Sequence, residues 1–348
     1  MTWQTQRLPG DHPPVSSGMI GVLLVNLGTP DGPDPDSVRR YLKQFLSDTR
    51  VVEIPPIVWQ LILRGIILNT RPQKSAKAYA KVWTERGSPL ADITSRQAEA
   101  MAKTFGARFG DKVVVDYAMR YGNPSIESRL TKLMADGCDR ILIAPMYPQY
   151  CAATTATVFD EVAGVLKKMR WQPALRFVPP YHDEPSFLAA LADDLTRQVR
   201  ALAFKPEVML LSFHGMPQQT LEKGDPYYCH CMKTARLLRE QLSGRPEFAG
   251  VRFETTFQSR FGPAAWLEPS TDATLMAEGD KGTKRLVVAA PGFAADCVET
   301  LEELALEGRD EFIEHGGEDY AVLECLNTSD DGLAMIDAML RRELSGWI

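Results

Sequence analysis

Three segments in the first half of the chain recur in the same order in the second half. Residues 23–30 (LLVNLGTP) resemble residues 210–217 (LLSFHGMP), residues 118–124 (AMRYGNP) resemble residues 258–263 (QSRFGP), and residues 140–145 (RILIAP) resemble residues 285–291 (RLVVAAP). One such match would be weak evidence, but three in register indicate a structural duplication. We therefore expect two similar lobes that meet near Pro179 and Pro180.

Short aliphatic runs, separated by longer helical patterns, define the class of fold. Residues 88–109 and 185–202 are long enough for helices that connect parallel strands. The strand-like runs are apolar throughout rather than alternating, which is typical of parallel strands buried on both faces. These runs are residues 22–27, 113–117, 141–144, 208–213, 253–257 and 286–290. The pattern predicts an α/β protein in which polar loops at the carboxyl ends of the strands face a shared cleft.

The expected domain boundaries follow from the same pattern. Residues 1–18 are rich in Pro, Gly and Ser and predict a flexible N-terminal tail. Residues 19–180 and 181–325 are expected to form the two lobes. Residues 326–348 are expected to form a C-terminal helix that packs back on them.

Charge and cysteine distribution exclude several classes of protein. The formal net charge is −6 and no cluster of Lys and Arg occurs, so nucleic acid is not an expected partner. The chain has no C-x-x-C pair and no apolar secretory segment near its N-terminus, which predicts reduced cysteines in a cytoplasmic protein. The cysteines are Cys138, Cys151, Cys229, Cys231, Cys297 and Cys325.

Residues 54–68 (IPPIVWQLILRGIIL) form the most apolar stretch of the chain. The stretch is shorter than the roughly 20 residues of a membrane-spanning helix, and it contains Gln60 and Arg64. It can form a core helix or an exposed apolar lip that touches a bilayer or an apolar substrate. Composition alone favours the core helix, because buried helices are commoner than interfacial ones.

His214 is the histidine whose position most suggests chemistry. It follows the predicted strand 208–213 and precedes Gly215, so it is expected at the mouth of the cleft. An imidazole there can accept a proton near neutral pH or bind a metal ion. Position alone equally allows a histidine that only caps the strand end through backbone hydrogen bonds.

A row of acids follows in residues 296–307 (DCVETLEELALE). Asp296 and Glu299 fit an N-cap with its capping box. Glu299, Glu303 and Glu307 then recur every four residues, which places three carboxylates along one helix face. Such a row can be a solvated face or a path for protons or cations. An imidazole and a carboxylate in one cleft suit transient binding of Fe(II), Zn(II) or Co(II).

Other motifs are absent or weak. No P-loop, no G-x-G-x-x-G fingerprint and no G-x-S-x-G elbow occurs, so no nucleotide or serine-hydrolase chemistry is expected. Cys229 and Cys231 could bind a metal ion with His230, but their spacing is tight and no partner pair is evident, which favours solvent-side or core cysteines.

At these residues the sequence resembles the ferrochelatase family. The matching segments lie within residues 23–304 and are LLVNLGTP, AMRYGNPS, IAPMYPQY followed by Cys151 and Thr154–Thr155, LLSFHGMP, GDPYYCHC, FQSRFGPAAWLEPST and PGFAADCVETLEEL. The resemblance implies two Rossmann-like lobes, each with a parallel sheet flanked by helices, and a porphyrin cleft between them. It implies a lyase-class metallochelatase that inserts Fe(II) into protoporphyrin IX as the last step of haem biosynthesis, releasing two protons and using no nucleotide cofactor.

The resemblance also implies roles for residues of this chain. The family's cleft histidine corresponds to His214 and its cleft glutamate to Glu299, each as a catalytic residue and a metal ligand. Glu303 corresponds to a further catalytic acid on the same helix.

The expected substrate-binding residues lie in several of the matching segments and are Arg120, Tyr121, Leu27 and Trp266. The family's apolar lip corresponds to residues 54–68, so the resemblance favours an exposed lip in peripheral contact with the cytoplasmic face of a membrane.

Three departures from some relatives refine these expectations. Some relatives bind a [2Fe-2S] cluster through cysteines near the C-terminus, but here no cysteine follows Cys325, so no cluster is predicted. Some have a histidine where this chain has Cys297, which leaves more of the proton transfer to His214. Coproporphyrin-type relatives often have tyrosine where this chain has Leu27, which favours protoporphyrin.

Three other functions fit parts of the pattern. A chelatase for cobalt or another tetrapyrrole would share the fold, although such relatives often use more histidine ligands. A porphyrin or haem carrier would need an axial ligand and an apolar slot, but no row of carboxylates. A two-lobed solute-binding module would normally be exported. The sequence predicts no oligomeric state.

Overall fold

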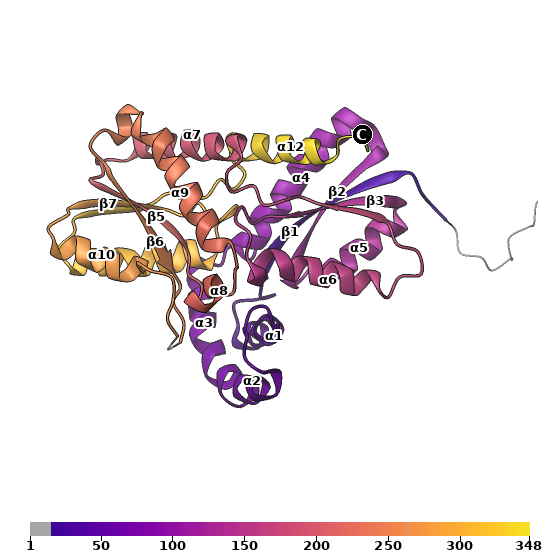
Figure 1. Cartoon of the computed structure of the whole chain (residues 1–348), viewed down its shortest axis with the longest axis horizontal. Coiled ribbons are helices and arrows are strands. Elements are labelled where there is room, and N and C mark those ends of the chain that lie inside the picture. The colour runs from indigo at the N-terminus through magenta and orange to yellow at the C-terminus, as the bar shows by residue number, and fades with distance from the viewer. Residues whose placement is uncertain (1–14, 263) are drawn as a thin grey trace, which may run out of the picture.

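Two four-stranded parallel sheets stand side by side, each with helices on both faces (Figure 1). The structure is a computed structural model and describes residues 15–262 and 264–348. Most of the expected N-terminal tail, residues 1–18, therefore lies outside the described residues. Each sheet belongs to one half of the chain, which confirms the predicted α/β fold with two similar lobes.

The strand order is the same in both sheets. The first sheet has the order β2-β1-β3-β4 and the second has the order β6-β5-β7-β8. The bounds are β1 (Met19–Thr29), β2 (Val113–Gly122), β3 (Cys138–Pro145), β4 (Ala174–Phe177), β5 (Val208–His214), β6 (Arg252–Gln258), β7 (Arg285–Ala289) and β8 (Asp319–Val322). The repeated segments fall on equivalent strands, β1 with β5, β2 with β6 and β3 with β7. The duplication inferred from sequence is therefore also a duplication of topology.

All six predicted strands are present, but β4 and β8 were missed. Each has only four residues and lies at the edge of its sheet. Arg176 in β4 and Asp319 in β8 interrupt the aliphatic pattern. An edge strand has one solvent-facing side, so it needs no continuous apolar run and gives a weak signal in the sequence.

Both predicted crossover helices form, as α4 (Pro89–Phe109) and α7 (Pro185–Ala201). Each begins at a proline, which is favoured there because the first helical N–H needs no partner. The remaining helices are α1 (Pro35–Leu46), α2 (Pro56–Ile62), α3 (Leu68–Val82), α5 (Ile126–Ala135), α6 (Thr157–Leu166), α8 (Gln218–Glu222), α9 (Tyr227–Ser243), α10 (Thr271–Asp280), α11 (Gly308–Glu314) and α12 (Asp330–Glu343). Three π-helical segments are η1 (Leu63–Ile67), η3 (Ala152–Ala156) and η5 (Glu299–Glu307), and two short 3₁₀ turns are η2 (Gly110–Lys112) and η4 (Pro246–Phe248).

A continuous hydrophobic core joins the lobes. It includes Leu24 of β1, Leu195 of α7, Leu211 of β5 and Met339 of α12, all at most 4% exposed. Helices α7 and α12 lie along one side of the molecule (Figure 1), and α12 packs against both α7 and α4. The C-terminal helix thus contacts elements of both halves. We propose residues 19–180 and 181–325 as the two lobes, with the connection near Pro179.

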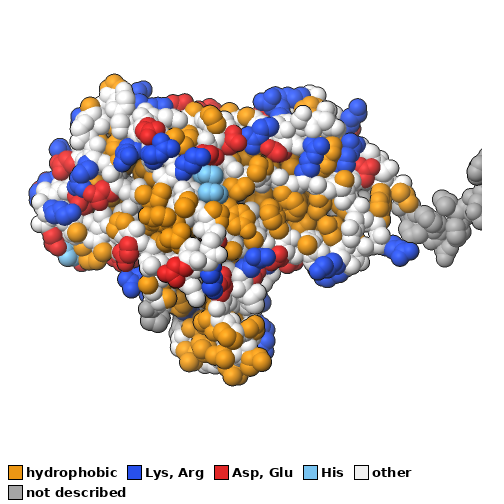
Figure 2. All heavy atoms as spheres, in the orientation of Figure 1, with side chains coloured by type: hydrophobic (Ala, Val, Ile, Leu, Met, Phe, Trp, Pro, Cys, Tyr) orange, Lys and Arg blue, Asp and Glu red, His pale blue; other side chains and the backbone are white. Residues whose placement is uncertain are grey.

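Helices α1 to α3 project from the junction of the lobes (Figure 1), and the lip, residues 54–68, is part of this projection. Ile57 and Leu61 are 83% and 73% exposed, and apolar atoms cover the tip of this projection (Figure 2). Trp59 and Leu63 point inward and are buried. The core helix favoured by composition is therefore wrong for the outer face of residues 54–68, because only one side of α2 has a helix to pack against.

Candidate active site

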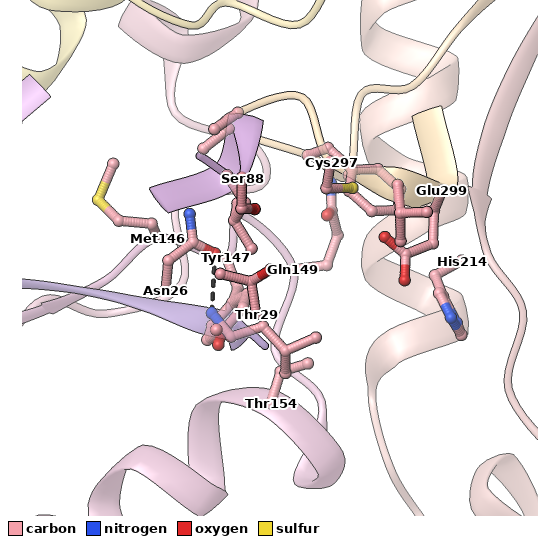
Figure 3. A pocket seen from close by; sticks show the side chains of 18 of the residues that line it. Asn26, Thr29, Ser88, Met146, Tyr147, Gln149, Thr154, His214, Cys297 and Glu299 are labelled. Atoms are coloured by element: carbon pink, nitrogen blue, oxygen red, sulfur yellow. Dashed lines mark hydrogen bonds between the residues drawn. The ribbon is translucent and has the colours of Figure 1, made fainter. Parts of the chain in front are cut away.

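A cavity of about 110 Å³ lies between the lobes and opens to solvent. The lining comes from both halves of the chain and includes Asn26, Leu27, Gly28, Thr29, Tyr41, Tyr79, Ser88, Leu90, Met146, Tyr147, Gln149, Thr154, His214, Tyr227, residues 292–295 and residues 297–299. Figure 3 shows His214 and Glu299 on one side of this space and Asn26, Thr29 and Met146 on another. The strand-end loops of the two lobes therefore form one cleft.

Glycines at equivalent positions set the shape of the two strand-end loops. A Cβ on Gly28 would lie 1.8 Å from the carbonyl oxygen of Tyr121 in β2. A Cβ on Gly215 would lie 2.6 Å from the carbonyl oxygen of Gln258 in β6. Gly28 also has a φ of +110°, which side chains other than glycine rarely adopt. The repeated glycine is thus required because adjacent strands approach closely where they reach the cleft.

His214 ends β5 and lines the cavity. Its Nδ1 lies 2.7 Å from the carbonyl oxygen of Gly215, which can only accept a hydrogen bond. Nδ1 therefore bears the proton of the neutral ring, and Nε2 keeps its lone pair. The Tyr227 hydroxyl donates to the backbone oxygen of His214 at 2.9 Å and holds the strand end. The imidazole is thus oriented to accept a proton or a metal ion at Nε2.

The acidic row lies on the π-helix η5 rather than on an α-helix. π-Helical turns are rare and occur frequently at functional sites. The predicted capping box is wrong, because no side chain caps the start of η5. The Asp296 carboxylate instead accepts hydrogen bonds from the Thr300 hydroxyl at 2.7 Å and from the Asn327 side-chain amide at 2.6 Å. Asp296 therefore ties η5 to the segment before α12.

The three acids of the row differ in their environment. Glu299 lines the cavity and is half-buried, Glu303 lies behind it, and Glu307 is exposed. Burial raises the pKa of Glu303 to about 7, and the nearby charge of Glu299 adds to the rise. The backbone N–H and the hydroxyl of Ser259 donate to the Glu303 carboxylate at 2.6 and 2.5 Å, which opposes the rise in its pKa. The row thus runs from the cavity to the surface, with a carboxyl in the middle that titrates near neutral pH.

Arg120 and Tyr121 do not line the cavity. Arg120 is 9% exposed and pairs with the Asp48 carboxylate at 2.6 Å. The Tyr121 hydroxyl donates to the same carboxylate oxygen at 2.9 Å, and Arg120 Nε donates to the carbonyl oxygen of Thr157 at 2.8 Å. In this structure the two side chains form a buried network that joins β2 to Asp48, in the segment after α1, and to Thr157 of α6. Their expected contact with substrate remains a prediction.

Leu27 lines the cavity and Trp266 does not. The Trp266 ring packs against Gly215, where a Cβ would lie 3.2 Å from the indole. Trp266 therefore supports the loop that follows His214. No group of three or more His, Cys, Asp or Glu residues that could hold a metal ion occurs within residues 15–262 and 264–348. Any metal binding at His214 and Glu299 would therefore use few protein ligands.

Sequence reasoning missed several residues of the cavity wall. Gln149, Tyr147 and Met146 follow β3 in the segment MYPQY, which the family resemblance already contained. Tyr41 of α1 and Tyr79 of α3 reach the cavity from the helices on either side of the lip. Neither of these tyrosines lies at a strand end, so no local pattern could assign them to the cleft.

The YCHC motif separates into residues with different surroundings. Cys229 is exposed, whereas Cys231 is buried in the core. His230 stacks on His182 with ring centroids 3.7 Å apart and an interplanar angle of 5°. Its Nδ1 accepts a hydrogen bond from the backbone N–H of Tyr150 at 3.2 Å. Cys229 and Cys231 are thus a solvent-side and a core cysteine, as expected, and His230 lies beside the loop that carries Gln149.

The two-lobed fold resembles that of two solved structures. The solved structure of SirB from Bacillus subtilis with Fe³⁺ matches 94% of this chain and 96% of its own with a TM-score of 0.54 and 11% identity. A Deinococcus radiodurans protein described as structurally similar to chelatases matches 93% of this chain and 55% of its own with a TM-score of 0.50 and 14% identity. At these identities the likeness concerns the two-lobed fold alone.

The sequence comparisons define the family. The ferrochelatase family model matches residues 19–344. A ferrochelatase of Rhizobium meliloti is 54% identical over 97% of this chain and 98% of its own length. A ferrochelatase of Rhodopseudomonas palustris is 48% identical over 98% of this chain and 97% of its own. The chain belongs to the ferrochelatase family.

Proposed function

We propose that the chain inserts Fe(II) into protoporphyrin IX, giving protohaem and two protons, as the last step of haem biosynthesis. The observation that supports this function best is the cavity between the lobes of a ferrochelatase-family chain, with His214 and Glu299, the first acid of the carboxylate row, on its wall. Most of the lining is apolar or aromatic, which suits a flat macrocycle. The row of acids gives the cavity a feature that a simple carrier does not need.

Metal insertion requires that two pyrrole N–H protons leave and that Fe(II) loses water. The lone pairs of a flat porphyrin lie in its own plane, so a cleft that bends one ring toward the metal would lower the barrier. His214 Nε2 would accept a proton or hold the metal ion briefly, and Glu299 would share that task. A well-placed base contributes typically about 10²–10⁴-fold to the rate.

Glu303 would move the released protons away from the cavity. A group whose pKa is about 7 can both accept and release a proton at neutral pH. Its neighbours on η5 are Glu299 on the cavity side and Glu307 on the solvent side. Protons would therefore pass from the porphyrin to Glu299, then to Glu303 and Glu307.

No resident cofactor is part of this proposal, and Fe(II) is a substrate. The prediction that the chain binds no [2Fe-2S] cluster can be tested by the visible absorption and iron content of protein purified without oxygen. Any stoichiometric sulfide would contradict it.

The lip would place the protein in peripheral contact with the cytoplasmic face of a membrane. Its exposed side chains Ile54, Ile57, Val58, Leu61 and Ile66 form an apolar surface of the kind that inserts into a bilayer boundary. Within the described part of the chain, no helix is long and apolar enough to cross a bilayer.

Liposome flotation would test this contact. Leu61→Asp should weaken liposome binding several-fold, because it puts a charge on the inserted face. Trp171→Asp, at an exposed apolar residue outside the lip, is the matched control. Equal binding of the two variants would exclude the lip as the membrane contact.

The function itself is tested with purified protein, Fe(II) and protoporphyrin IX under anaerobic conditions, by following the loss of free-porphyrin fluorescence. Coproporphyrin III and Co(II) serve as parallel substrates. His214→Ala and Glu299→Gln should each lower turnover at least about 10²-fold while porphyrin binding persists. Binding without metallation by the unaltered protein would indicate a carrier, and faster reaction of a parallel substrate would indicate another chelatase.

A further inference from the structure

Gln149 is a buried polar residue in the wall of the cavity. It lies in the loop after β3, is 2% exposed and lines the cavity from the N-terminal lobe. Its side-chain nitrogen donates a hydrogen bond to the Thr234 hydroxyl of α9 at 3.0 Å. The side-chain oxygen lies beside Gly292, where a Cβ would be 3.5 Å away. A buried polar side chain therefore reaches the cavity across the boundary between the lobes.

The Thr234 hydroxyl determines which end of the Gln149 amide faces the cavity. It donates to the carbonyl oxygens of His182 at 2.7 Å and His230 at 3.0 Å, and carbonyl oxygens only accept. The single hydroxyl proton is thus used, so Thr234 can only accept a hydrogen bond from Gln149. The amide must turn its NH₂ group toward Thr234 and its oxygen away from it. The cavity therefore contains an oriented, uncharged hydrogen-bond acceptor.

The surroundings keep this arrangement fixed. Thr234 is fully buried, and the His182 carbonyl belongs to the connection between the lobes. The next residue of the loop, Tyr150, donates its backbone N–H to His230 Nδ1 at 3.2 Å. That bond requires an unprotonated Nδ1, and burial lowers the pKa of His230. The loop that presents Gln149 is thus held at two successive residues by α9.

The chemistry of a free-base porphyrin makes this acceptor selective. The macrocycle has hydrogen-bond donors only at its pyrrole N–H groups, since its ionised propionates accept. Metal insertion removes both N–H protons, so the metallated product has no donor for the amide oxygen. An amide oxygen is also too weakly basic to take the proton, which leaves deprotonation to other groups.

We propose that Gln149 is a substrate-binding residue whose amide oxygen accepts a hydrogen bond from a pyrrole N–H of the free-base porphyrin, and that Thr234 is the residue that positions it. This inference rests on the proposed function for the identity of the ligand. The hydrogen bond favours the substrate over the metallated product, so its loss on metal insertion assists product release.

Equilibrium binding of two fluorescent probes tests the inference. Protoporphyrin IX has the N–H donors, and zinc protoporphyrin IX lacks them. Thr234→Val and Gln149→Leu should weaken protoporphyrin binding about tenfold, because each removes or misorients a buried acceptor. Zinc protoporphyrin binding should change less than about threefold. Thr234→Ser keeps the hydroxyl and should restore the selectivity of the unaltered protein.

Thr274→Val is the matched control, because the Thr274 hydroxyl donates to the carbonyl oxygen of Ser270, the residue before α10, and Thr274 does not line the cavity. Thermal unfolding of every variant shows whether a loss of porphyrin binding comes from a loss of folded protein. If Thr234→Val folds poorly, Gln149→Leu still tests the inference. In turnover, Thr234→Val should raise the KM for protoporphyrin and leave kcat near that of the unaltered protein. A catalytic base in the same place would lower kcat instead.

The outcomes separate this inference from the proposed function. Equal weakening of both probes, or no weakening in Gln149→Leu, would overturn the role of Gln149 even if the protein metallates protoporphyrin. Selective weakening by a protein that inserts no metal would support Gln149 and contradict the proposed function. Failure of the unaltered protein to bind protoporphyrin would overturn both.

Discussion

Glu303→Gln should make the stability of the protein less dependent on pH. Burial raises the pKa of Glu303 from its ordinary 4.5 to about 7. Between these values the folded protein binds more protons than the unfolded chain, so the free energy of unfolding falls as the pH rises through that window. At about 1.4 kcal/mol per pKa unit, the fall amounts to about 3 kcal/mol. Glutamine has the same shape and removes the titration.

Urea denaturation at a series of pH values measures this effect. The difference in free energy of unfolding, variant minus unaltered protein, should grow by about 3 kcal/mol from about pH 4.5 to about pH 7.5 in favour of Glu303→Gln. Glu307→Gln removes a charge from the exposed end of the same row and reports the contribution of that charge alone. Parallel stability curves for Glu303→Gln and the unaltered protein would refute the assignment of a raised pKa to this carboxyl.

Two further substitutions test the framework around the cavity. Asp48→Asn should lower the free energy of unfolding by about 3 kcal/mol in urea, because it leaves the buried Arg120 charge without its nearest partner. Asp160→Asn is the control, because it breaks the exposed ion pair with Arg50 and should lower the free energy of unfolding by less than about 1 kcal/mol. An equally small effect of Asp48→Asn would show that Asp48 does not stabilise the buried Arg120. Gly215→Ala should lower the free energy of unfolding by about 1–3 kcal/mol and reduce metallation, because its Cβ would lie 2.6 Å from the Gln258 carbonyl oxygen. An alanine variant with unchanged stability and activity would contradict the requirement for glycine beside the cleft.

Local sequence patterns were sufficient to predict the buried strands, the two lobes and the positions of two cleft residues. The aliphatic runs of β1 and β5 identify buried parallel strands, and their repetition predicts two similar lobes. Polar residues directly after such strands must face the same edge of the sheet. His214 could therefore be assigned to the cleft, and Glu299 followed from the helix after β7.

Other features depend on contacts between distant residues, and only the tertiary structure decided them. The outer face of α2 is exposed because no element covers the lip, and the apolar composition of Leu61 and its neighbours could not show this. Arg120 follows an apolar run like His214, yet it turns toward Asp48 because a buried guanidinium needs a carboxylate partner. Gln149 acquires an orientation only when Thr234, 85 positions later, meets it across the lobes. Sequence periodicity reports which face of an element is buried, whereas the partner on that face is set by packing.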